Sequence, residues 1–274
     1  MNNSCQYCEL CGSQSVTDNY FIPQYNISNS NIISKCNDCN FLFKTHQITD
    51  DIKLTDGGYY SAKKVGGKID KRFINHFSKR AKDHYRFIKQ YINTQPKIAL
   101  DIGCGAGFFI KELLNDNWNV KGIEPDPIMS KYAIDSKLNV KPVLLSDFNT
   151  LDKFGLIYLS HVLDDIPNIN ITLDKINHLL SSNGILFIEV PNYSWNYRLN
   201  FIKKEDFLIG NYYFTIRSLK AVMAKHNFGM IKQYTFESVH TNTLLQKITS
   251  PLRMVSKLKP PAMKSYLRGI FRKL

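Results

Sequence analysis

The stretch from residue 98 to residue 107, Ile-Ala-Leu-Asp-Ile-Gly-Cys-Gly-Ala-Gly, constrains the fold of this chain more than any other. An apolar run leads into Asp101, glycines follow at the alternate positions 103, 105 and 107, and an amphipathic segment comes next. This order predicts a strand, a tight turn and the start of a helix, because glycine lets the backbone turn sharply and approach a ligand closely. Asp101 would repel a pyrophosphate, so the pattern favours a ligand that is cationic or offers hydroxyl and amine groups.

A second carboxylate follows the next predicted strand. Residues 119–123, Asn-Val-Lys-Gly-Ile, lead into Glu124, and a carboxylate at that place can accept hydrogen bonds from both hydroxyls of a ribose. The alternative is an NAD-binding βαβ unit, whose fingerprint spaces its glycines as G-x-G-x-x-G. The glycines alternate here instead, so the sequence favours a different nucleoside ligand.

The Leu-Asp-Ile-Gly-Cys-Gly-Ala-Gly of residues 100–107, with Glu124 after the next strand, resembles the motifs of class I methyltransferases that depend on S-adenosylmethionine (SAM). The resemblance implies SAM as the cofactor and a doubly wound, Rossmann-like sheet. It also implies that Asp101, Gly103, Cys104 and Gly105 meet the methionine part of SAM, that Glu124 holds the ribose, that Pro125 and Ile128 line the adenine, and that Asp147 accepts from the adenine amine with Phe148 beside it. For Asp147 the alternative is a helix N-cap.

The segment after the fourth predicted strand, residues 160–167, is where the acceptor and the methyl group meet in this family. Many relatives read His-Val-Leu-Glu-His there, whereas this chain keeps the first histidine as His161 and has Asp164-Asp165 in place of Glu-His. Because histidine titrates near neutral pH, His161 is the candidate catalytic base. The alternative is a histidine that only shapes the cofactor pocket. The Asp pair is expected either to hold a sugar hydroxyl or to cap the next turn.

Two cysteine pairs precede all of this. Cys8-x₂-Cys11 is followed by a glycine, and 24 residues separate Cys11 from the second pair, Cys36-x₂-Cys39. Each pair can place two thiolates on one side of Zn²⁺, and four sulfurs complete a closed, structural tetrahedron. The alternatives are disulfides, which a cytosolic chain disfavours, and a shifted pair in which Cys5 replaces Cys8. The sequence therefore predicts a structural zinc site of Cys8, Cys11, Cys36 and Cys39.

The formal charge of +13 is unevenly distributed along the 274 residues. Residues 98–197 carry 7 basic and 12 acidic side chains, whereas residues 198–274 carry 15 and 3. Basic flanks around an acidic core are typical of a protein that binds a polyanion. The alternative is a surface that is rich in lysine without such a partner. No apolar run reaches 18 residues and no secretory signal is visible, so the expected compartment is the cytoplasm.

The remaining pattern alternates between strands and helices, which predicts an α/β fold with a parallel sheet and ligands at the carboxyl ends of its strands. Four parts are expected: a zinc-binding module (residues 1–46), a linker with an amphipathic helix (47–95), the SAM-binding core (96–240) and a basic tail (241–274). Strands are expected at residues 31–35, 41–44, 97–102, 120–123, 142–145, 156–159, 185–190 and 230–237. Helices are expected at 68–93, 107–116, 127–137, 171–180 and 216–226.

The tail differs from the rest because no acidic residue follows Glu237. Within residues 262–274 the apolar side chains of Met263, Tyr266, Leu267, Ile270, Phe271 and Leu274 form one helical stripe, with the basic residues largely off it. The pattern predicts a basic amphipathic C-terminal helix, either at the surface of an anionic membrane through residues 251–274 or docked on the protein itself. The family usually adds an antiparallel seventh strand, for which residues 243–248 are the candidate.

A cysteine-rich N-terminal module, a Tyr-Tyr linker (Tyr59-Tyr60) and Pro-Asn after the fifth strand (Pro191-Asn192) together resemble a bacterial subgroup of these methyltransferases. That resemblance implies a sugar or glycan substrate, free, nucleotide-linked or lipid-linked, in cell-surface polysaccharide biosynthesis. The alternative is an RNA base methyltransferase with a zinc module, in which the basic flanks would contact phosphates; nucleic acid is the less favoured partner, because the cysteine module itself is slightly acidic. A third reading is a SAM-fold binding subunit without activity.

Overall fold

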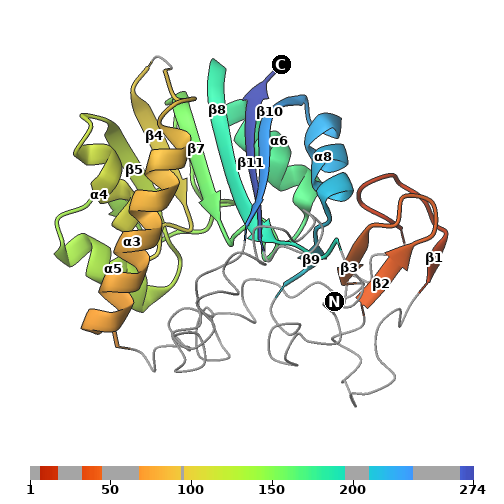
Figure 1. The fold of residues 1–274 in the computed structure, drawn as a ribbon, viewed down its shortest axis with the longest axis horizontal. Coiled ribbons are helices and arrows are strands. Elements are labelled where there is room, and N and C mark those ends of the chain that lie inside the picture. Colours follow the sequence, from red (N-terminus) through yellow and green to blue (C-terminus); the bar gives the residue numbers. More distant parts are fainter. Residues whose placement is uncertain (1–6, 18–32, 45–67, 94–95, 195–209, 237–265) are drawn as a thin grey trace, which may run out of the picture.

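The computed structural model describes residues 7–17, 33–44, 68–93, 96–194, 210–236 and 266–274. Its centre is a seven-stranded sheet in the order β10-β11-β8-β7-β4-β5-β6 (Figure 1). These strands are β4 (Ile98–Ile102), β5 (Asn119–Ile123), β6 (Val140–Lys141), β7 (Phe154–Ser160), β8 (Leu180–Pro191), β10 (Phe228–Phe236) and β11 (Tyr266–Lys273). The predicted α/β fold is confirmed.

Helices cover both faces of this sheet (Figure 1). One face carries α3 (Lys71–Ile88), α4 (Phe108–Leu114) and α5 (Pro127–Asp135), and the other carries α6 (Ile169–Leu179) and α8 (Ile216–Lys225). Side chains of β4 alternate between the two cores: Leu100 and Ile102 belong to the α6/α8 side and Ala99 to the α3/α4 side. Such alternation is what a strand buried on both faces requires.

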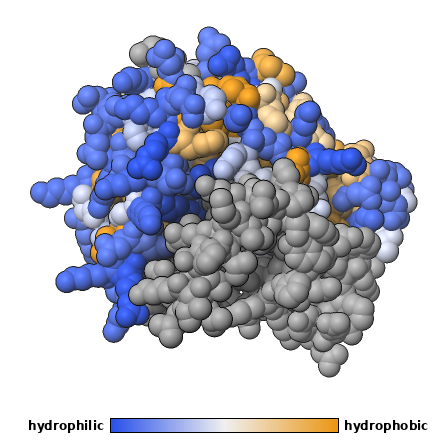
Figure 2. Space-filling model, viewed as in Figure 1, coloured by the Kyte–Doolittle hydropathy of each residue, from blue (hydrophilic) through white to orange (hydrophobic). Residues whose placement is uncertain are grey.

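Local sequence explains where the helices begin. Asp70 precedes α3 and its carboxylate accepts a hydrogen bond from the Phe73 backbone N–H at 2.8 Å. Asp126 caps α5 in the same way, with Pro127 as the first helical residue, as an N-cap followed by proline predicts. The outer face of α3 carries exposed lysines and arginines and contributes to the hydrophilic surface on that side of the molecule (Figure 2).

Strands β4, β5, β7 and β8 run parallel to their neighbours, since β4 pairs in parallel with both β5 and β7, and β7 pairs in parallel with β8. Their carboxyl ends therefore meet at one edge of the sheet, where ligands bind in folds of this type. The predicted strand at residues 142–145 is wrong by two to four positions. The observed strand β6 ends at Lys141 because Pro142 has no N–H with which to continue the ladder.

The predicted C-terminal helix is wrong for residues 266–273. These residues form β11, which pairs antiparallel with both β10 and β8. Leu267 and Phe271 point into the α6/α8 core and Ile270 into the α3/α4 core. A short strand that is buried on both faces can show the same spacing of apolar residues as the apolar stripe of a helix. For this reason the periodicity predicted a helix here. An interfacial membrane helix cannot include these buried residues.

β11 occupies the antiparallel seventh-strand place that the family resemblance implies, whereas the candidate at residues 243–248 lies outside the described residues. Residues 251–265 of the tail also lie outside them. Among the helices that the structure describes, none is both long enough and apolar enough to cross a bilayer.

A second, four-stranded sheet belongs to the cysteine region, in the order β1 (Val16–Thr17), β2 (Ile33–Cys36), β3 (Leu42–Lys44) and β9 (Tyr212–Tyr213). The last strand comes from the chain between β8 and α8, far along the sequence from the other three. The Phe41 ring packs at 5.9 Å from the Tyr212 ring and 5.7 Å from the Phe214 ring, measured between centroids. The cysteine region is thus joined to the core around the seven-stranded sheet by both hydrogen bonds and aromatic packing.

Candidate active site

The glycine turn links β4 to α4 along the chain and is hydrogen-bonded to the carboxyl end of β5. The backbone N–H groups of Gly103 and Cys104 both donate to the carbonyl of Ile123, at 2.9 and 3.1 Å. Gly103 has a φ of +67°, and a Cβ built on it would lie 2.4 Å from Cγ2 of Val162. Only glycine fits there, both for its backbone conformation and for the contact with the segment after β7.

Gly105 shows the opposite situation. Its φ is +53°, yet no heavy atom lies within 4 Å of a Cβ built on it, so it faces open space. Its N–H donates to Oε2 of Glu124 at 2.7 Å, while Oε1 of Glu124 accepts from the N–H of Asp126 at 2.9 Å. The predicted ribose carboxylate is therefore fixed in orientation beside the open turn. Burial raises the pKa of Glu124 to about 7.

Asp101 is the most unusual group in the site. Its side chain is 1% exposed, and neither carboxylate oxygen has a hydrogen-bond partner among the described residues. Burial, followed by the charge of Glu124, raises the pKa of Asp101 well above its ordinary value. Since a buried carboxylate without a partner costs several kcal/mol, Asp101 is poised for a ligand that brings a donor or a positive charge. The ammonium and sulfonium of SAM supply both, so these residues fit the cofactor that the family implies.

The structure thus brings together Asp101, Gly103, Cys104, Gly105 and Glu124. Cys104 is half-buried behind the turn, and a Cβ built on Gly122 would lie 2.8 Å from its sulfur, so it acts as a small residue that fits. Pro125 is half-buried and Ile128 is exposed. Phe148 is buried in the core, whereas the Asp147 side chain is exposed and accepts from Ser146 at 3.2 Å. The roles of these last four at the adenine stay predictions.

His161 directly follows β7 and has a left-handed backbone, with a φ of +56°. Its N–H donates to the carbonyl of Glu189 at 2.8 Å, and its ring Nε2 lies 3.2 Å from Oε1 of the same residue. Burial, together with the positive charge of Arg80, lowers the pKa of His161 to about 4. The imidazole is therefore neutral at neutral pH, which is the form that a general base requires.

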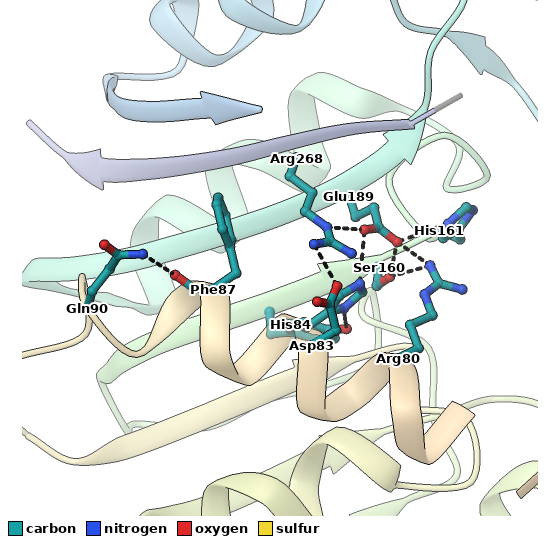
Figure 3. Close-up of polar contacts among 10 residues, drawn as sticks. Arg80, Asp83, His84, Phe87, Gln90, Ser160, His161, Glu189 and Arg268 are labelled. Atoms are coloured by element: carbon teal, nitrogen blue, oxygen red, sulfur yellow. Dashed lines mark hydrogen bonds and ion pairs between the residues drawn. The ribbon is translucent and has the colours of Figure 1, made fainter. Parts of the chain in front are cut away.

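Glu189 is the centre of a polar cluster that the sequence argument missed (Figure 3). Its carboxylate is 1% exposed, and side chains from α3, β7, β11 and the segment after β7 contact it. These groups are Arg80 and His84 from α3, Ser160 from β7, His161 after β7, and Arg268 from β11. A signal was present in the sequence: a glutamate inside the apolar run of residues 185–190 has to find partners in the protein interior.

The segment after His161 is held from the other side by β9. The backbone carbonyl of Asp164 accepts from the backbone N–H groups of Asn211 and Tyr212, at 2.7 and 3.0 Å. The Asn211 side chain donates to the carbonyl of Asp165 at 2.8 Å. The N–H of Lys44, at the end of β3, donates to the carbonyl of Asn211 at 2.8 Å. The cysteine region therefore reaches the segment after β7 through two hydrogen-bonded steps.

The four predicted metal ligands lie together. The sulfurs of Cys8, Cys11, Cys36 and Cys39 all lie within 4.8 Å of one another, and the pairs Cys8–Cys39 and Cys11–Cys36 are 3.5 Å apart. A disulfide would need a sulfur separation of about 2 Å, whereas four sulfurs at about 2.3 Å from Zn²⁺ are separated by roughly 3.8 Å. The spacing of the thiols fits a tetrahedral metal. Cys5 lies outside the described residues.

Comparison with known proteins agrees with this arrangement. Residues 73–233 match the family model of the methyltransferase domain. A ubiquinone biosynthesis O-methyltransferase of Glaesserella parasuis is 29% identical over 37% of this chain, and the chain spans about half, 50%, of the length of that relative.

Solved structures of similar fold include a SAM-dependent methyltransferase from Archaeoglobus fulgidus, with a TM-score of 0.55 and 17% identity over 74% of this chain and 100% of that one. Another from Methanosarcina mazei has a TM-score of 0.52 and 16% identity over 69% and 98%. The family match covers more than half of the 274 residues. The chain belongs to the methyltransferase domain family, and its fold is that of the SAM-dependent methyltransferases among the solved structures.

Proposed function

We propose that this methyltransferase transfers the methyl group of SAM to a hydroxyl of a sugar or glycan, free, nucleotide-linked or lipid-linked, in cell-surface polysaccharide biosynthesis. The observation that carries the cofactor part is the buried carboxylate of Asp101, which has no partner among the described residues and lies beside the open turn at Gly105. In this proposal Asp101 accepts from the ammonium of SAM, and Glu124, oriented by two backbone N–H groups, accepts from the ribose hydroxyls.

The acceptor part of the proposal is supported by the neutral His161 at the carboxyl end of β7. Methyl transfer is an in-line displacement for which the protein mainly supplies alignment. A hydroxyl nucleophile also has to lose its proton, and His161 is the candidate that would take it. The partial relative is an O-methyltransferase by its name, which agrees with an oxygen acceptor.

We also propose that Cys8, Cys11, Cys36 and Cys39 hold a structural Zn²⁺. Four sulfur ligands leave no open position on the metal, so its role is folding rather than chemistry. Because β9 adds to the sheet of this region and also contacts the segment after His161, the metal would stabilise the acceptor side of the site. Chelation should release about one Zn²⁺ per chain and lower the melting temperature of the protein.

An RNA base methyltransferase stays the alternative. The lysines and arginines exposed along α3 give it one surface that could contact phosphates. The cysteine region is hydrogen-bonded to the core rather than free to read a separate nucleic acid, and this favours the glycan proposal.

The test is methyl transfer from SAM with a labelled methyl group. Nucleotide sugars, a polyprenyl-linked sugar and total RNA are compared as acceptors at a SAM concentration below the wild-type Kd. Asp101→Asn is the reference with weakened cofactor binding, and Asp135→Asn, which changes an exposed carboxylate on α5, is the matched control. The proposal predicts label in a sugar fraction that wild type and Asp135→Asn produce equally and that Asp101→Asn produces at least about tenfold more slowly. Label in RNA alone would overturn it in favour of the alternative.

A further inference from the structure

Neither cofactor binding nor the proposed role of His161 as a base explains why so many polar side chains gather around Glu189. Figure 3 shows five side chains converging on one carboxylate. Oε1 faces Arg80, Ser160 at 3.3 Å and His161 at 3.2 Å, and Oε2 faces His84 at 2.9 Å and Arg268 at 2.6 Å. Because an ionised carboxylate can only accept hydrogen bonds, each of these groups faces it favourably only with an N–H, an O–H or a positive charge.

Charge balance keeps this carboxylate ionised. Burial acts to raise the pKa of Glu189, but the Arg80 guanidinium and the N–H groups of His84 and His161 that face the carboxylate more than offset it and hold the pKa well below its ordinary value. Arg268 adds a second guanidinium, which is itself balanced by Asp83 at 2.9 Å. Glu189 is therefore an acceptor throughout the pH range of ordinary enzyme assays.

An acceptor at Glu189 decides the tautomers of two histidines. His84 directs Nε2 at Glu189 and Nδ1 at the hydroxyl of Tyr158. With the proton of His84 on Nε2, which faces the carboxylate, Nδ1 accepts a hydrogen bond from the Tyr158 hydroxyl. His161 directs its Nε2 at the same carboxylate, and the same reasoning places its proton on Nε2 and its lone pair on Nδ1.

Glu189 also holds the backbone of His161. The Glu189 carbonyl accepts the His161 N–H at 2.8 Å, and residue 161 keeps a left-handed conformation that costs a non-glycine residue about 1–2 kcal/mol. The ring packs edge-on against Tyr266 at a centroid separation of 5.0 Å, yet its side chain remains 29% exposed. A backbone hydrogen bond and a close polar contact to the same residue, together with an aromatic contact, thus fix where the ring lies while leaving part of it open.

We propose that Glu189 is a positioning residue for methyl transfer, which holds His161 as the Nε2–H tautomer and so leaves Nδ1 as the basic nitrogen toward the acceptor. The inference rests on the proposed function, because it assigns the role of base to His161. In the step, the acceptor oxygen forms a bond to the methyl carbon while the bond from that carbon to sulfur breaks and its electron pair returns to sulfur. The acceptor proton moves to Nδ1, and the resulting imidazolium is stabilised by Glu189 until water removes the proton.

The direct test reads the tautomer and needs no acceptor. Histidine labelled with ¹⁵N in the full-length protein, bound to S-adenosylhomocysteine, gives distinct nitrogen shifts for protonated and unprotonated ring nitrogens. Comparison with the His161→Asn variant assigns the signal. The expected result is a single Nε2–H tautomer in wild type, a mixture of tautomers in Glu189→Gln, and an unchanged Nε2–H tautomer in the matched control Asp83→Asn, which removes a carboxylate of the same cluster that faces Arg268 rather than His161.

An Nδ1–H ring in wild type would overturn the inference, and so would an Nε2–H population that does not change in Glu189→Gln. Glu189→Gln leaves two arginines facing a neutral amide, so it could fail to fold. In that case Glu189→Asp, which keeps the charge but withdraws it by one methylene, replaces it, and the wild-type spectrum still decides the first point.

Kinetics with an acceptor found in the labelling assay give the second readout. Glu189→Gln and His161→Asn should each lower kcat by about 10²- to 10⁴-fold with little change in the SAM affinity, and the double variant should be no slower than His161→Asn alone. Additive losses would overturn the inference, because they would mean that Glu189 acts independently of His161. Absence of methyl transfer to any acceptor would count against the proposed function, whereas the tautomer measurement counts only for or against the role of Glu189.

Discussion

The substitution Asp101→Asn separates cofactor binding from folding because it should move the two in different directions. Asp101 is buried, its oxygens have no partner among the described residues, and burial raises its pKa. Burial therefore disfavours the ionised carboxylate in the free protein. Asparagine has nearly the same shape and carries no charge, so the unfolding free energy of the free protein should stay within about 1 kcal/mol of wild type or rise.

With SAM bound, the position has to be ionised to pair with the cationic cofactor. A hydrogen bond to a charged group contributes about 1.5–3 kcal/mol, which corresponds to a roughly 10- to 150-fold weaker Kd for SAM in Asp101→Asn. S-adenosylhomocysteine lacks the sulfonium but keeps the ammonium. Its affinity should fall as well, and the ratio of the two losses reports how much of the effect comes from the methyl-bearing sulfur.

The assay pairs calorimetric titration with urea unfolding, each performed with and without SAM. Asp135→Asn is the control, since its carboxylate is exposed in a surface ion pair with Lys131 and should change stability by no more than about 0.5 kcal/mol. A Kd for SAM within about threefold of wild type in Asp101→Asn would refute the reasoning. So would a loss of several kcal/mol in the free protein, because Asp101 would then be a structural residue.

Three further outcomes are expected. Since burial raises the pKa of Glu124 to about 7, lowering the pH from 8 to 6 protonates it and should weaken SAM binding roughly tenfold, a change that Glu124→Gln should remove in the same calorimetric series. Gly103→Ala places a methyl group 2.4 Å from Val162 and should destabilise the protein by roughly 2–3 kcal/mol in urea unfolding. Gly105→Ala faces open space and should lower the affinity for SAM more than the stability. Equal effects of the two substitutions would contradict the assignment of the turn. Phe271→Ala should cost about 3–5 kcal/mol, because Phe271 lies buried in β11; a loss below about 1 kcal/mol would contradict the central place of that strand.

Much of the core could be predicted from the sequence because its signals are local. The alternation of apolar runs with capped amphipathic segments placed α5 and β5 within two residues of their observed bounds. The glycine turn also identified its own position, since the combination of Asp101, three glycines and Glu124 lies within 24 residues. The proximity of the two carboxylates follows from the parallel pairing of β4 and β5.

The rest depends on contacts between distant parts of the chain. Arg268 has no local sign of being a buried strand residue, because Glu189, which neutralises it at 2.6 Å, lies 79 positions away. The same is true of β9, whose Tyr212 pairs with Phe43 of the cysteine region. Both elements are specified by the tertiary environment rather than by local propensity, which is why periodicity assigned a helix to one and no regular structure to the other.

The central claim is that the turn from Gly103 to Gly105, flanked by Asp101 and Glu124, binds the methyl donor. A crystal structure of the full chain with S-adenosylhomocysteine tests it most directly. We predict that the amine of the ligand lies within hydrogen-bonding distance of Asp101 and the ribose hydroxyls within the same distance of Glu124. A ligand bound elsewhere, or a well-ordered complex in which Asp101 still has no partner, would contradict the account.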